Sequence, residues 1–476
     1  MITLPYMAGF TVAVLGLGRS GLQTAKALLQ SEAEVWAWDD NEDVRARAEA
    51  EGIPLVNLHQ VDWREPVTLV LSPGIPDRLP EPHPVAAMAR QAGCEIVGDI
   101  ELLGRAVPDA SYIGITGTNG KSTTTALIAH LLNLSGREAQ VGGNLGRPVL
   151  DFDPVEPGAY YVLEMSSYQL ERTASITFDV AVLLNVAPDH LDRHGDMAGY
   201  IAAKTNIFRR QTKPRAAVVG VDDEHSRKVY ADLQATGAQT LVPVSCLGPV
   251  EGGVGVEDGV LVDDLDGQGV RAFDLRELPA LPGRHNWQNA AVAYAACRKI
   301  GVDAPVIAAC LRSFPGLPHR QEPVATIDGV AFVNDSKATN ADAAQRALAC
   351  YRRIYWIAGG RAKQGGLAGT EPYFDHVRRA YLIGEAEDAF AAALDGTLET
   401  ARCGDLDSAV RQAFADAKAD GAEGAVVLLS PACASFDQFA NFEARGDRFK
   451  QLVGELEGTR GAISDAHLSA QAGGSA

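Results

Sequence analysis

The sequence lacks paired cysteines, a surplus of basic residues and any long hydrophobic run. Its seven cysteines are scattered and odd in number, which is typical of buried free thiols in a reducing compartment and not of a disulfide framework. The net charge of −19 argues against nucleic acid or an anionic membrane as the main partner. The apolar run at residues 10–15 is too short for a signal peptide or a membrane span, so we expect no membrane insertion and a cytoplasmic protein.

The chain is long enough for more than one domain. At 476 residues it exceeds what a single hydrophobic core supports. Strand-like runs at residues 11–15, 34–38 and 67–71 alternate with helix-like segments, which predicts an α/β fold with mostly parallel sheets. Short Gly- and Asp-rich strands between residues 241 and 281 predict a small antiparallel insert. The expected parts are a Rossmann-like domain at 1–108, a central P-loop domain at 109–316, a Rossmann-like α/β domain at 317–460 and a disordered tail at 461–476.

A Gly-rich turn between an apolar strand and a helix start is the most informative segment. Gly117 and Gly120 let backbone N–H groups surround phosphate oxygens, and Lys121 would offset the phosphate charge. The general Walker A spacing would place its first glycine at Ile115, so this loop is a variant of that pattern. A turn that binds nothing is the alternative. The predicted ATP contacts here are Gly117, Thr118, Asn119, Gly120, Lys121, Ser122 and Thr123, with the Ser122 hydroxyl on Mg²⁺.

A second Gly-rich turn follows the first strand. The run Gly16-Leu17-Gly18-Arg19-Ser20-Gly21, with Asp39 after the second strand, matches a dinucleotide fingerprint and its ribose-binding acid. Alone it would suggest an NAD-dependent dehydrogenase, or a glycine turn needed only for packing. The roughly 105 residues before the P-loop hold one mononucleotide-binding half, whereas a full dinucleotide fold uses two. With a further turn at Ser72-Pro73-Gly74, these residues favour a nucleotide diphosphate conjugate.

Polar residues follow two strands of the central domain. Glu164 ends an apolar strand, where a magnesium ligand is expected beside a P-loop. Asp189, His190 and Asp192 follow the next strand, and a lone histidine there is as often a satisfied polar residue as a ligand. Lys204 has two interpretations from the residues alone, a lysine on a helix surface or a counter-charge, because an ammonium cannot ligate a cation.

The third domain carries polar turns at its strand ends. Residues 334–340 and 358–363 each place a lysine in a strand-to-helix turn that resembles an anion site, and residues 430–439 add hydroxyls and small side chains. Each turn by itself could be only a helix cap. Together they favour a shared ligand cleft.

Several motifs together resemble the Mur ligases of peptidoglycan synthesis, from about residue 12 to residue 448. They are Gly-Thr-Asn-Gly-Lys-Ser-Thr-Thr, Asp-His-Leu-Asp with a downstream Ala-Ala-Lys, His-Asn-Trp-Gln-Asn, Leu-Pro-His-Arg and Asn-Asp-Ser-Lys-Ala-Thr-Asn. Within that family, residues 163–170 and 430–435 resemble the members that add D-glutamate. The Asp-Asn-Pro-Arg motif of the members that add diaminopimelate is absent.

The resemblance implies an ATP-dependent ligase with small-molecule substrates and no nucleic-acid partner, which we expect to be monomeric. ATP would phosphorylate the carboxylate of UDP-N-acetylmuramoyl-L-alanine, the D-glutamate amine would attack the acyl phosphate, and phosphate would leave. A hinge at residues 314–318 would let the domains close. A ligase with another amino-acid specificity, a dehydrogenase and a P-loop regulator remain alternatives.

The resemblance also assigns residues, each carried over from the family motifs. The implied catalytic residues are Lys121, His190, Lys204 and Lys337. Two magnesium sites are implied, one held by Ser122 and Glu164 and one by His190 and Lys204 as a carbamate. Further ATP contacts are Asn286, Asn289, Arg320 and Asp335, with His319 helping closure. The UDP-substrate contacts are Gly16, Leu17, Gly18, Arg19, Ser20, Asp39, Ser72, Pro73, Gly74, Asn144 and Ser166. The D-glutamate contacts are Thr339, Lys363, Ser435 and Phe442.

Overall fold

The computed structural model describes residues 1–278, 280–363, 365–421 and 424–461. Two compact units emerge, the first from Met1–Phe273 with Gln288–Leu311 and the second from Asp274–Trp287 with the chain from Arg312 onward. The three predicted domain ranges and the hinge at residues 314–318 stay predictions. Most of the predicted tail, residues 462–476, lies outside the described residues, and Gly461 ends a short strand.

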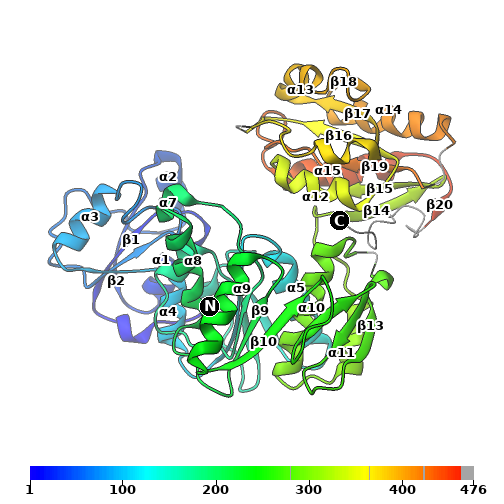
Figure 1. Ribbon diagram of the computed structural model, residues 1–476. Coiled ribbons are helices and arrows are strands. Elements are labelled where there is room, and N and C mark those ends of the chain that lie inside the picture. Colours follow the sequence, from blue (N-terminus) through cyan, green and yellow to red (C-terminus); the bar gives the residue numbers. More distant parts are fainter. Residues whose placement is uncertain (279, 364, 422–423, 462–476) are drawn as a thin grey trace. The chain divides into compact units, whose positions relative to one another are not determined.

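The first sheet of unit 1 has four parallel strands in the order β2-β1-β3-β4. Figure 1 labels its strands β1 and β2 and its helices α1 to α4. Its strands alternate with helices along the chain, which is the pattern expected for right-handed βαβ crossovers. The strands are β1 (Thr11–Leu15), β2 (Glu34–Trp38), β3 (Thr68–Leu71) and β4 (Glu95–Val97). The helices are α1 (Arg19–Gln30), α2 (Glu42–Ala50), α3 (Pro84–Gln91) and α4 (Asp99–Ala106).

The second sheet has nine strands in the order β13-β12-β11-β10-β9-β8-β5-β7-β6. Along the sheet from β11 to β6, which includes β5, all neighbouring strands pair in parallel, and β11 pairs antiparallel with β12. The strands are β5 (Ser111–Thr116), β6 (Ala139–Gly143), β7 (Tyr160–Glu164), β8 (Val180–Leu183), β9 (Ala216–Gly220), β10 (Thr240–Ser245), β11 (Val254–Glu257), β12 (Val260–Asp263) and β13 (Val270–Asp274). The helices are α5 (Lys121–Leu134), α6 (Ser167–Glu171), α7 (Leu191–His194), α8 (Met197–Thr205), α9 (Glu224–Thr236), α10 (Arg284–Lys299) and α11 (Ala304–Leu311).

One sequence expectation is wrong here. Residues 241–281 do not form a separate antiparallel insert, because β10 and β11 extend the main sheet in parallel before β12 turns back. Most Gly and Asp residues of this segment lie in the connections, whereas Gly255, Asp263 and Asp274 lie in strands β11, β12 and β13.

The sheet of unit 2 has the order β18-β17-β16-β19-β15-β14-β20, with parallel pairing from β18 to β15 and antiparallel pairing around β14. Its strands are β14 (Glu322–Ile327), β15 (Val330–Asn334), β16 (Ile354–Gly359), β17 (Val377–Ile383), β18 (Thr400–Gly404), β19 (Val426–Leu429) and β20 (Arg460–Gly461). Its helices are α12 (Ala341–Cys350), α13 (Glu387–Leu394), α14 (Leu406–Ala419) and α15 (Phe442–Glu455).

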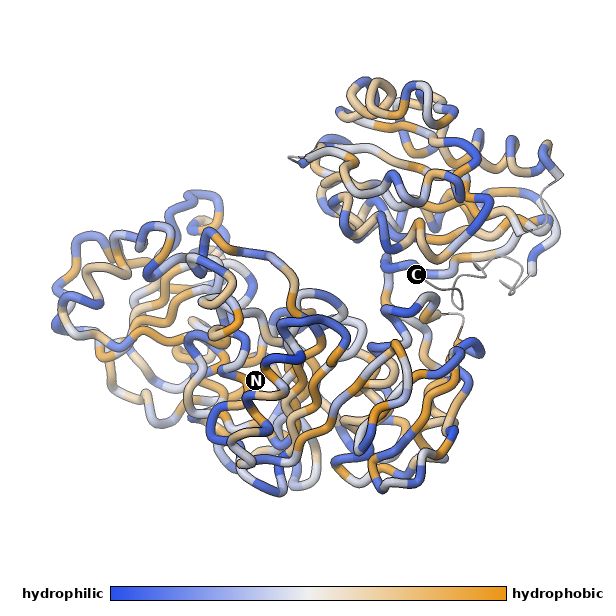
Figure 2. The backbone as a smooth tube through the Cα atoms, in the orientation of Figure 1, coloured by the Kyte–Doolittle hydropathy of each residue, from blue (hydrophilic) through white to orange (hydrophobic). Residues whose placement is uncertain are grey.

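Hydrophobic residues follow the central strands, and hydrophilic residues follow the outer helices and connections within each unit (Figure 2). Strands β8, β9, β15 and β16 are buried at every position, as expected for parallel strands covered on both faces. The order of the strands in each sheet determines which strand-end loops are neighbours.

Two further observations bear on the composition. Among the described residues, no helix has both the length and the apolar character needed to cross a bilayer. All seven cysteines are free thiols, as predicted. Three of them are buried, whereas Cys94, Cys246, Cys310 and Cys403 are partly exposed, so the prediction of burial is confirmed for three of the seven.

Candidate functional site

The Gly-rich turn at residues 117–120 joins buried β5 to the start of α5. Gly120 has φ 83° and is the N-cap of α5, where a Cβ would lie 2.2 Å from Asn289 Oδ1. Gly117, with φ 154°, would bring a Cβ to 2.9 Å from Leu184 Cβ. The turn is therefore built for glycine at both positions, and it leaves the N-terminal amides of a fourteen-residue helix available for an anion.

Three predicted site residues converge on this turn. Lys121 Nζ donates to the carbonyl oxygens of Gly117 and Thr118, each at 2.9 Å. Lys204 Nζ, from α8, donates to the same Gly117 oxygen at 2.8 Å. The Thr118 hydroxyl donates to Ala187 O at 3.1 Å. The structure thus brings Lys121, Thr118 and Lys204 together, although Lys204 is 83 positions from Lys121 in the sequence.

Lys204 is a buried amine. Its side chain is 2% exposed, and Nζ lies 4.5 Å from the centre of the Tyr200 ring. Burial, together with the nearby Lys121 ammonium, lowers the pKa of Lys204 to about 7, although Asp189 acts in the opposite direction. A substantial share of this amine is neutral at neutral pH, and a neutral amine is a nucleophile. The alternative of an ordinary lysine on a helix surface is wrong, because a surface lysine is solvated and Lys204 is buried.

Glu164 ends β7 beside the P-loop strand and is 2% exposed. Its Oε1 accepts a hydrogen bond from Asn144 Nδ2 at 2.7 Å. Its Oε2 is buried and has no hydrogen-bond partner among the described residues. A buried carboxylate oxygen without a partner is costly, so this atom is suited to a cation.

His190 lies at the start of the four-residue helix α7, with φ 53°. Its Nε2 is 3.4 Å from Asp189 Oδ2, and its ring centre is 5.0 Å from that of Tyr168. A positive φ is uncommon for histidine, so the backbone here depends on its surroundings. Ser166 caps α6 in a capping box with Gln169.

The fingerprint turn lies where three parallel strands end. Because β1 is between β2 and β3, Gly16, Asp39 and Ser72 follow adjacent strand ends. Asp39 Oδ2 accepts from the Leu17 amide at 2.7 Å, and Ser72 Oγ donates to Gly16 O at 2.9 Å. Arg19 reaches Gly146 O at 2.6 Å, in the loop that carries Asn144.

Glycine suits positions 16, 18 and 21 of this turn for different physical reasons. A Cβ on Gly21 would lie 1.8 Å from Gly16 O, and a Cβ on Gly16 would lie 2.7 Å from Ser72 Cβ, so both positions are required by packing. A Cβ on Gly18 would meet nothing within 4 Å. Gly18 is exposed at the N-cap of α1, where the absence of a side chain gives a ligand access to the backbone.

A histidine–aspartate cluster lies beside Asp39. His59 Nε2 is 3.2 Å from Asp40 Oδ1, and His83 Nε2 is 2.8 Å from Asp40 Oδ2. His83 Nδ1 accepts from the Val85 amide at 3.2 Å, so a neutral His83 ring carries its proton on Nε2. A metal would need that same Nε2 unprotonated, and the cluster is therefore better described as two imidazoles that donate to one carboxylate.

In unit 2, three adjacent parallel strands end in the predicted polar turns. The order β16-β19-β15 places the turns after Gly359, Leu429 and Asn334 along one edge of the sheet. The 358–363 and 430–435 turns pair through two backbone hydrogen bonds between Arg361 and Ala434, at 2.9 and 3.0 Å. Of the predicted residues in these turns, Ser435 is buried, Thr339 and Phe442 are half-buried, and Lys363 is exposed.

Asp335 is held inside the first of these turns. It accepts hydrogen bonds from Ser430 Oγ at 2.8 Å and from the Gln321 amide at 3.1 Å. Burial raises its pKa to about 7. Lys337 Nζ lies 5.6 Å from the centre of the Phe442 ring. Asp335, Lys337 and Phe442 are thus neighbours. His319 is buried beside them, and its Nδ1 accepts a hydrogen bond from Asn334 Nδ2 at 3.0 Å.

Two predicted ATP contacts belong to different units. Asn289 lies in unit 1, where its Oδ1 is 3.3 Å from Thr124 Oγ1. Asn286 lies in unit 2, where its Nδ2 donates to Pro282 O at 2.7 Å. Arg320 also belongs to unit 2, next to the turn that holds Asp335.

Sequence reasoning missed Arg445, which is 1% exposed on α15. Its guanidinium donates to Ser336 Oγ at 3.0 Å, to Ser336 O at 2.8 Å and to Cys433 O at 3.1 Å. Burial lowers its pKa to about 10, and Nη1 has no partner among the described residues. The only sequence signal was an arginine on the apolar side of an amphipathic helix, three residues after Phe442.

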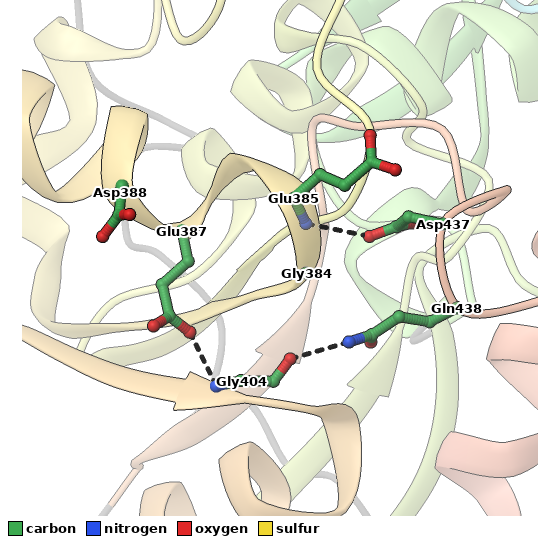
Figure 3. A pocket seen from close by; sticks show the side chains of 7 residues that line it. All are labelled: Gly384, Glu385, Glu387, Asp388, Gly404, Asp437 and Gln438. Carbon is green, nitrogen blue, oxygen red and sulfur yellow. Dashed lines mark hydrogen bonds between the residues drawn. The ribbon is translucent and has the colours of Figure 1, made fainter.

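A hollow of about 360 Å³ lies apart from these turns, at the ends of β17 and β18 (Figure 3). Acidic side chains dominate its lining, and the Glu385 amide donates to Asp437 Oδ2 at 3.1 Å. Glu387 accepts from the Gly404 amide at 2.6 Å. Carboxylates repel a dicarboxylic amino acid, so this hollow does not suit D-glutamate. It is lined by Gly384, Glu385, Glu387, Asp388, Gly404, Asp437 and Gln438.

The fold and the P-loop define the class, a multidomain α/β protein with a phosphate-binding type of turn. Residues 115–297 match the family model described as the Mur ligase middle domain, and residues 319–433 match Mur ligase, glutamate ligase domain. A curated UDP-N-acetylmuramoylalanine--D-glutamate ligase of Rhodospirillum rubrum is 52% identical over 97% of this chain and 98% of that protein. One of the same name from Phenylobacterium zucineum is 50% identical over 96% and 98%. The chain belongs to the Mur ligase family.

Solved structures share the fold. UDP-N-acetylmuramate-alanine ligase of Thermotoga maritima has a TM-score of 0.59 at 16% identity, covering 93% of this chain and 99% of that one. A pseudomurein peptide ligase type C of Methanothermus fervidus has a TM-score of 0.52 at 16% identity, covering 94% and 100%. The α/β fold predicted from the sequence is confirmed by the sheets and by these likenesses.

Proposed function

We propose that this protein is an ATP-dependent ligase that adds D-glutamate to UDP-N-acetylmuramoyl-L-alanine in peptidoglycan precursor synthesis, forming ADP and phosphate. The observation that carries the proposal is that this chain is 52% identical to a protein named for this activity, over 98% of that protein's length. We further propose that the protein is a soluble monomer and that it works in the cytoplasm, where ATP and UDP-sugars are made.

The chemistry assigned to the chain begins at the P-loop. Lys121 and the first amides of α5 would bind the β- and γ-phosphates and offset charge as the γ-phosphoryl group passes to the substrate carboxylate. The D-glutamate amine would then attack the acyl carbon, and phosphate would leave. In support of the proposal, Lys121 Nζ donates to Gly117 O at 2.9 Å, within the loop that would hold the phosphates.

The residues present fit a magnesium ion near the γ-phosphate. Ser122 is 8% exposed at the first turn of α5, and the unpartnered Glu164 Oε2 supplies the anionic oxygen that Mg²⁺ prefers. Bound there, magnesium would offset negative charge on the phosphates. Asn144 would orient Glu164 by its hydrogen bond to Oε1.

Lys204 is proposed to act as a carbamate, with His190, at a second cation site. The neutral amine nitrogen would bond to the carbon of CO₂ and release a proton, which converts a buried base into an anionic oxygen donor. Support comes from its burial beside Tyr200 and the P-loop and from its depressed pKa. The role of Lys204 as a mere counter-charge is the competing proposal.

We also propose residues for the remaining ligands, following the family motifs. The turns at Gly16–Gly21, Asp39 and Ser72–Gly74 would hold the UDP group, with Asn144 and Ser166 toward the muramoyl side. Asn286, Asn289, Arg320 and Asp335 would surround the nucleoside of ATP, with Lys337 near its phosphates. Thr339, Lys363, Ser435 and Phe442 would bind D-glutamate. Domains at 1–108, 109–316 and 317–460 would close about residues 314–318 to exclude water from the acyl phosphate.

Two glycine variants separate packing from ligand access at the proposed UDP site. Gly21→Ala should lower the thermal unfolding temperature by several degrees, because its Cβ would lie 1.8 Å from Gly16 O. Gly18→Ala should unfold like the parent, because its Cβ meets nothing within 4 Å, yet raise the KM for the UDP substrate about tenfold or more. Calorimetry and steady-state kinetics measure the two effects. A Gly18→Ala protein with an unchanged KM would remove the UDP group from this turn.

The direct test of the function is phosphate release from ATP with UDP-N-acetylmuramoyl-L-alanine present. D-glutamate, L-glutamate, L-alanine and diaminopimelate are added separately, and stimulation by D-glutamate alone is expected. Stimulation by another amino acid would keep the ATP chemistry and overturn the assignment of Thr339, Lys363, Ser435 and Phe442. No stimulation by any of them would favour a P-loop regulator, and binding of NAD(P) would favour a dehydrogenase.

A further inference from the structure

A buried ion-pair cluster joins the four-stranded and the nine-stranded sheet of unit 1. Asp77 Oδ1 accepts from Arg172 Nη2 at 2.9 Å and from Arg193 Nη2 at 3.2 Å. The side chains are 14%, 5% and 6% exposed respectively. We call Asp77, Arg172 and Arg193 the Asp77 clamp.

The clamp holds the proposed UDP loop by its backbone. Arg172 Nη2 donates to Ile75 O at 2.8 Å, and its Nη1 lies 3.3 Å from Ser72 O. Arg193 Nη1 donates to Leu79 O at 3.0 Å. Residues 72–79 thus meet two guanidinium groups from the other sheet of the unit, at three carbonyl oxygens and one carboxylate.

The two arginines come from the segments that carry the proposed cation ligands. Arg172 directly follows α6, which begins three residues after Glu164, and Arg193 lies in α7, which has His190 as its N-cap. Glu171 links the segments, since its carboxylate is 3.5 Å from Arg193 Nη2 and 3.0 Å from His194 Nδ1.

The charges of the Asp77 clamp favour one arrangement of its three side chains. Burial alone would raise the pKa of Asp77, but hydrogen bonds and charge from Arg172 and Arg193 outweigh it and lower the pKa to about 2. Removing one partner of a buried pair leaves an uncompensated charge, so the members favour one mutual arrangement. The same segment is also held by His194, whose Nε2 lies 2.9 Å from Ser167 Oγ, and by the Arg193 guanidinium, which lies 5.4 Å from the centre of the Tyr168 ring.

We propose that the Asp77 clamp couples the UDP-substrate loop to the His190 segment, so that occupancy of residues 72–79 orders residues 189–194 for catalysis. Asp77, Arg172 and Arg193 are positioning residues in this scheme and touch no reacting atom. The inference rests on the proposed function, because it takes the 72–79 loop as part of the UDP site.

Hydrogen exchange of the full chain tests the coupling without any metal or ATP. UDP-N-acetylmuramoyl-L-alanine should slow amide exchange at residues 16–21 and 72–79, and also at residues 189–194, by about fivefold or more in the parent protein. In Asp77→Asn the slowing at residues 16–21 should remain, whereas the slowing at residues 189–194 should be lost. Asp62→Asn, which removes an exposed carboxylate paired with Arg64, should behave like the parent.

The outcomes separate the two proposals. No protection at residues 16–21 and 72–79 in the parent would refute the UDP site itself. Protection there but not at residues 189–194, or protection at both that survives in Asp77→Asn, would overturn the coupling. If Asp77→Asn fails to fold, Arg193→Lys provides the same test, because lysine keeps the charge but lacks the planar guanidinium whose two Nη atoms bond Leu79 O and Asp77 separately.

Discussion

Lys121→Ala should reduce kcat by about 1,000-fold, which corresponds to about 4 kcal/mol of lost transition-state stabilisation. The side chain is the cation at the proposed phosphate turn, and no other lysine is hydrogen-bonded to both Gly117 O and Thr118 O among the described residues. Phosphate release under saturating substrates measures the effect.

The matched control for this variant is Lys228→Ala, which removes an exposed lysine paired with Asp232 and should leave kcat unchanged. Circular dichroism should show both variants folded. A Lys121→Ala enzyme that retained more than a tenth of the parental kcat would refute the assignment of Lys121 to the phosphates.

Lys204→Ala should likewise reduce kcat by about 1,000-fold, and short carboxylates such as formate or acetate should restore activity about tenfold or more. The expectation follows from the buried position of Nζ, where a carbamate would place an anionic oxygen and where alanine leaves room for a small acid. Activity titrated with each acid measures the rescue.

The acid rescue has a built-in comparison. Lys121→Ala should not respond to the same acids, because that position is assigned a cation beside the same Gly117 oxygen. Carbon-13 carbon dioxide should also give a carbamate resonance in the parent that Lys204→Ala lacks. Absence of both rescue and resonance would leave Lys204 as a counter-charge.

Much of the fold was predictable because local rules act strongly in this chain. Strands β1 and β2 have the predicted bounds, residues 11–15 and 34–38. Strand β1 is buried at four of its five positions and reads as a continuous hydrophobic segment, whereas β2 alternates buried and more exposed positions. The segment β10–β12 was misread because a single sequence shows that two strands are short, but not which neighbours they pair with.

The site was predictable to the extent that it follows strand ends. The turns at Gly16, Gly117 and Asn334 lie where parallel strands end. Glycines indicate the first two turns in the sequence, and a run of polar residues indicates the third. Burial was not predictable in the same way. Lys204 reads as a surface lysine, and Arg445 and Asp77 read as ordinary charges, until tertiary packing places each beside its partners.

Arg445 bears on attempts to change which amino acid the protein accepts. One guanidinium on α15 is bonded to the turn after β15 and the turn after β19, and the latter is bonded in turn to the one after β16. The three turns therefore behave mechanically as one piece. Transplanting a single turn from a relative of different specificity would break its bonds to the other two, so productive chimeras should exchange all three turns together with the start of α15.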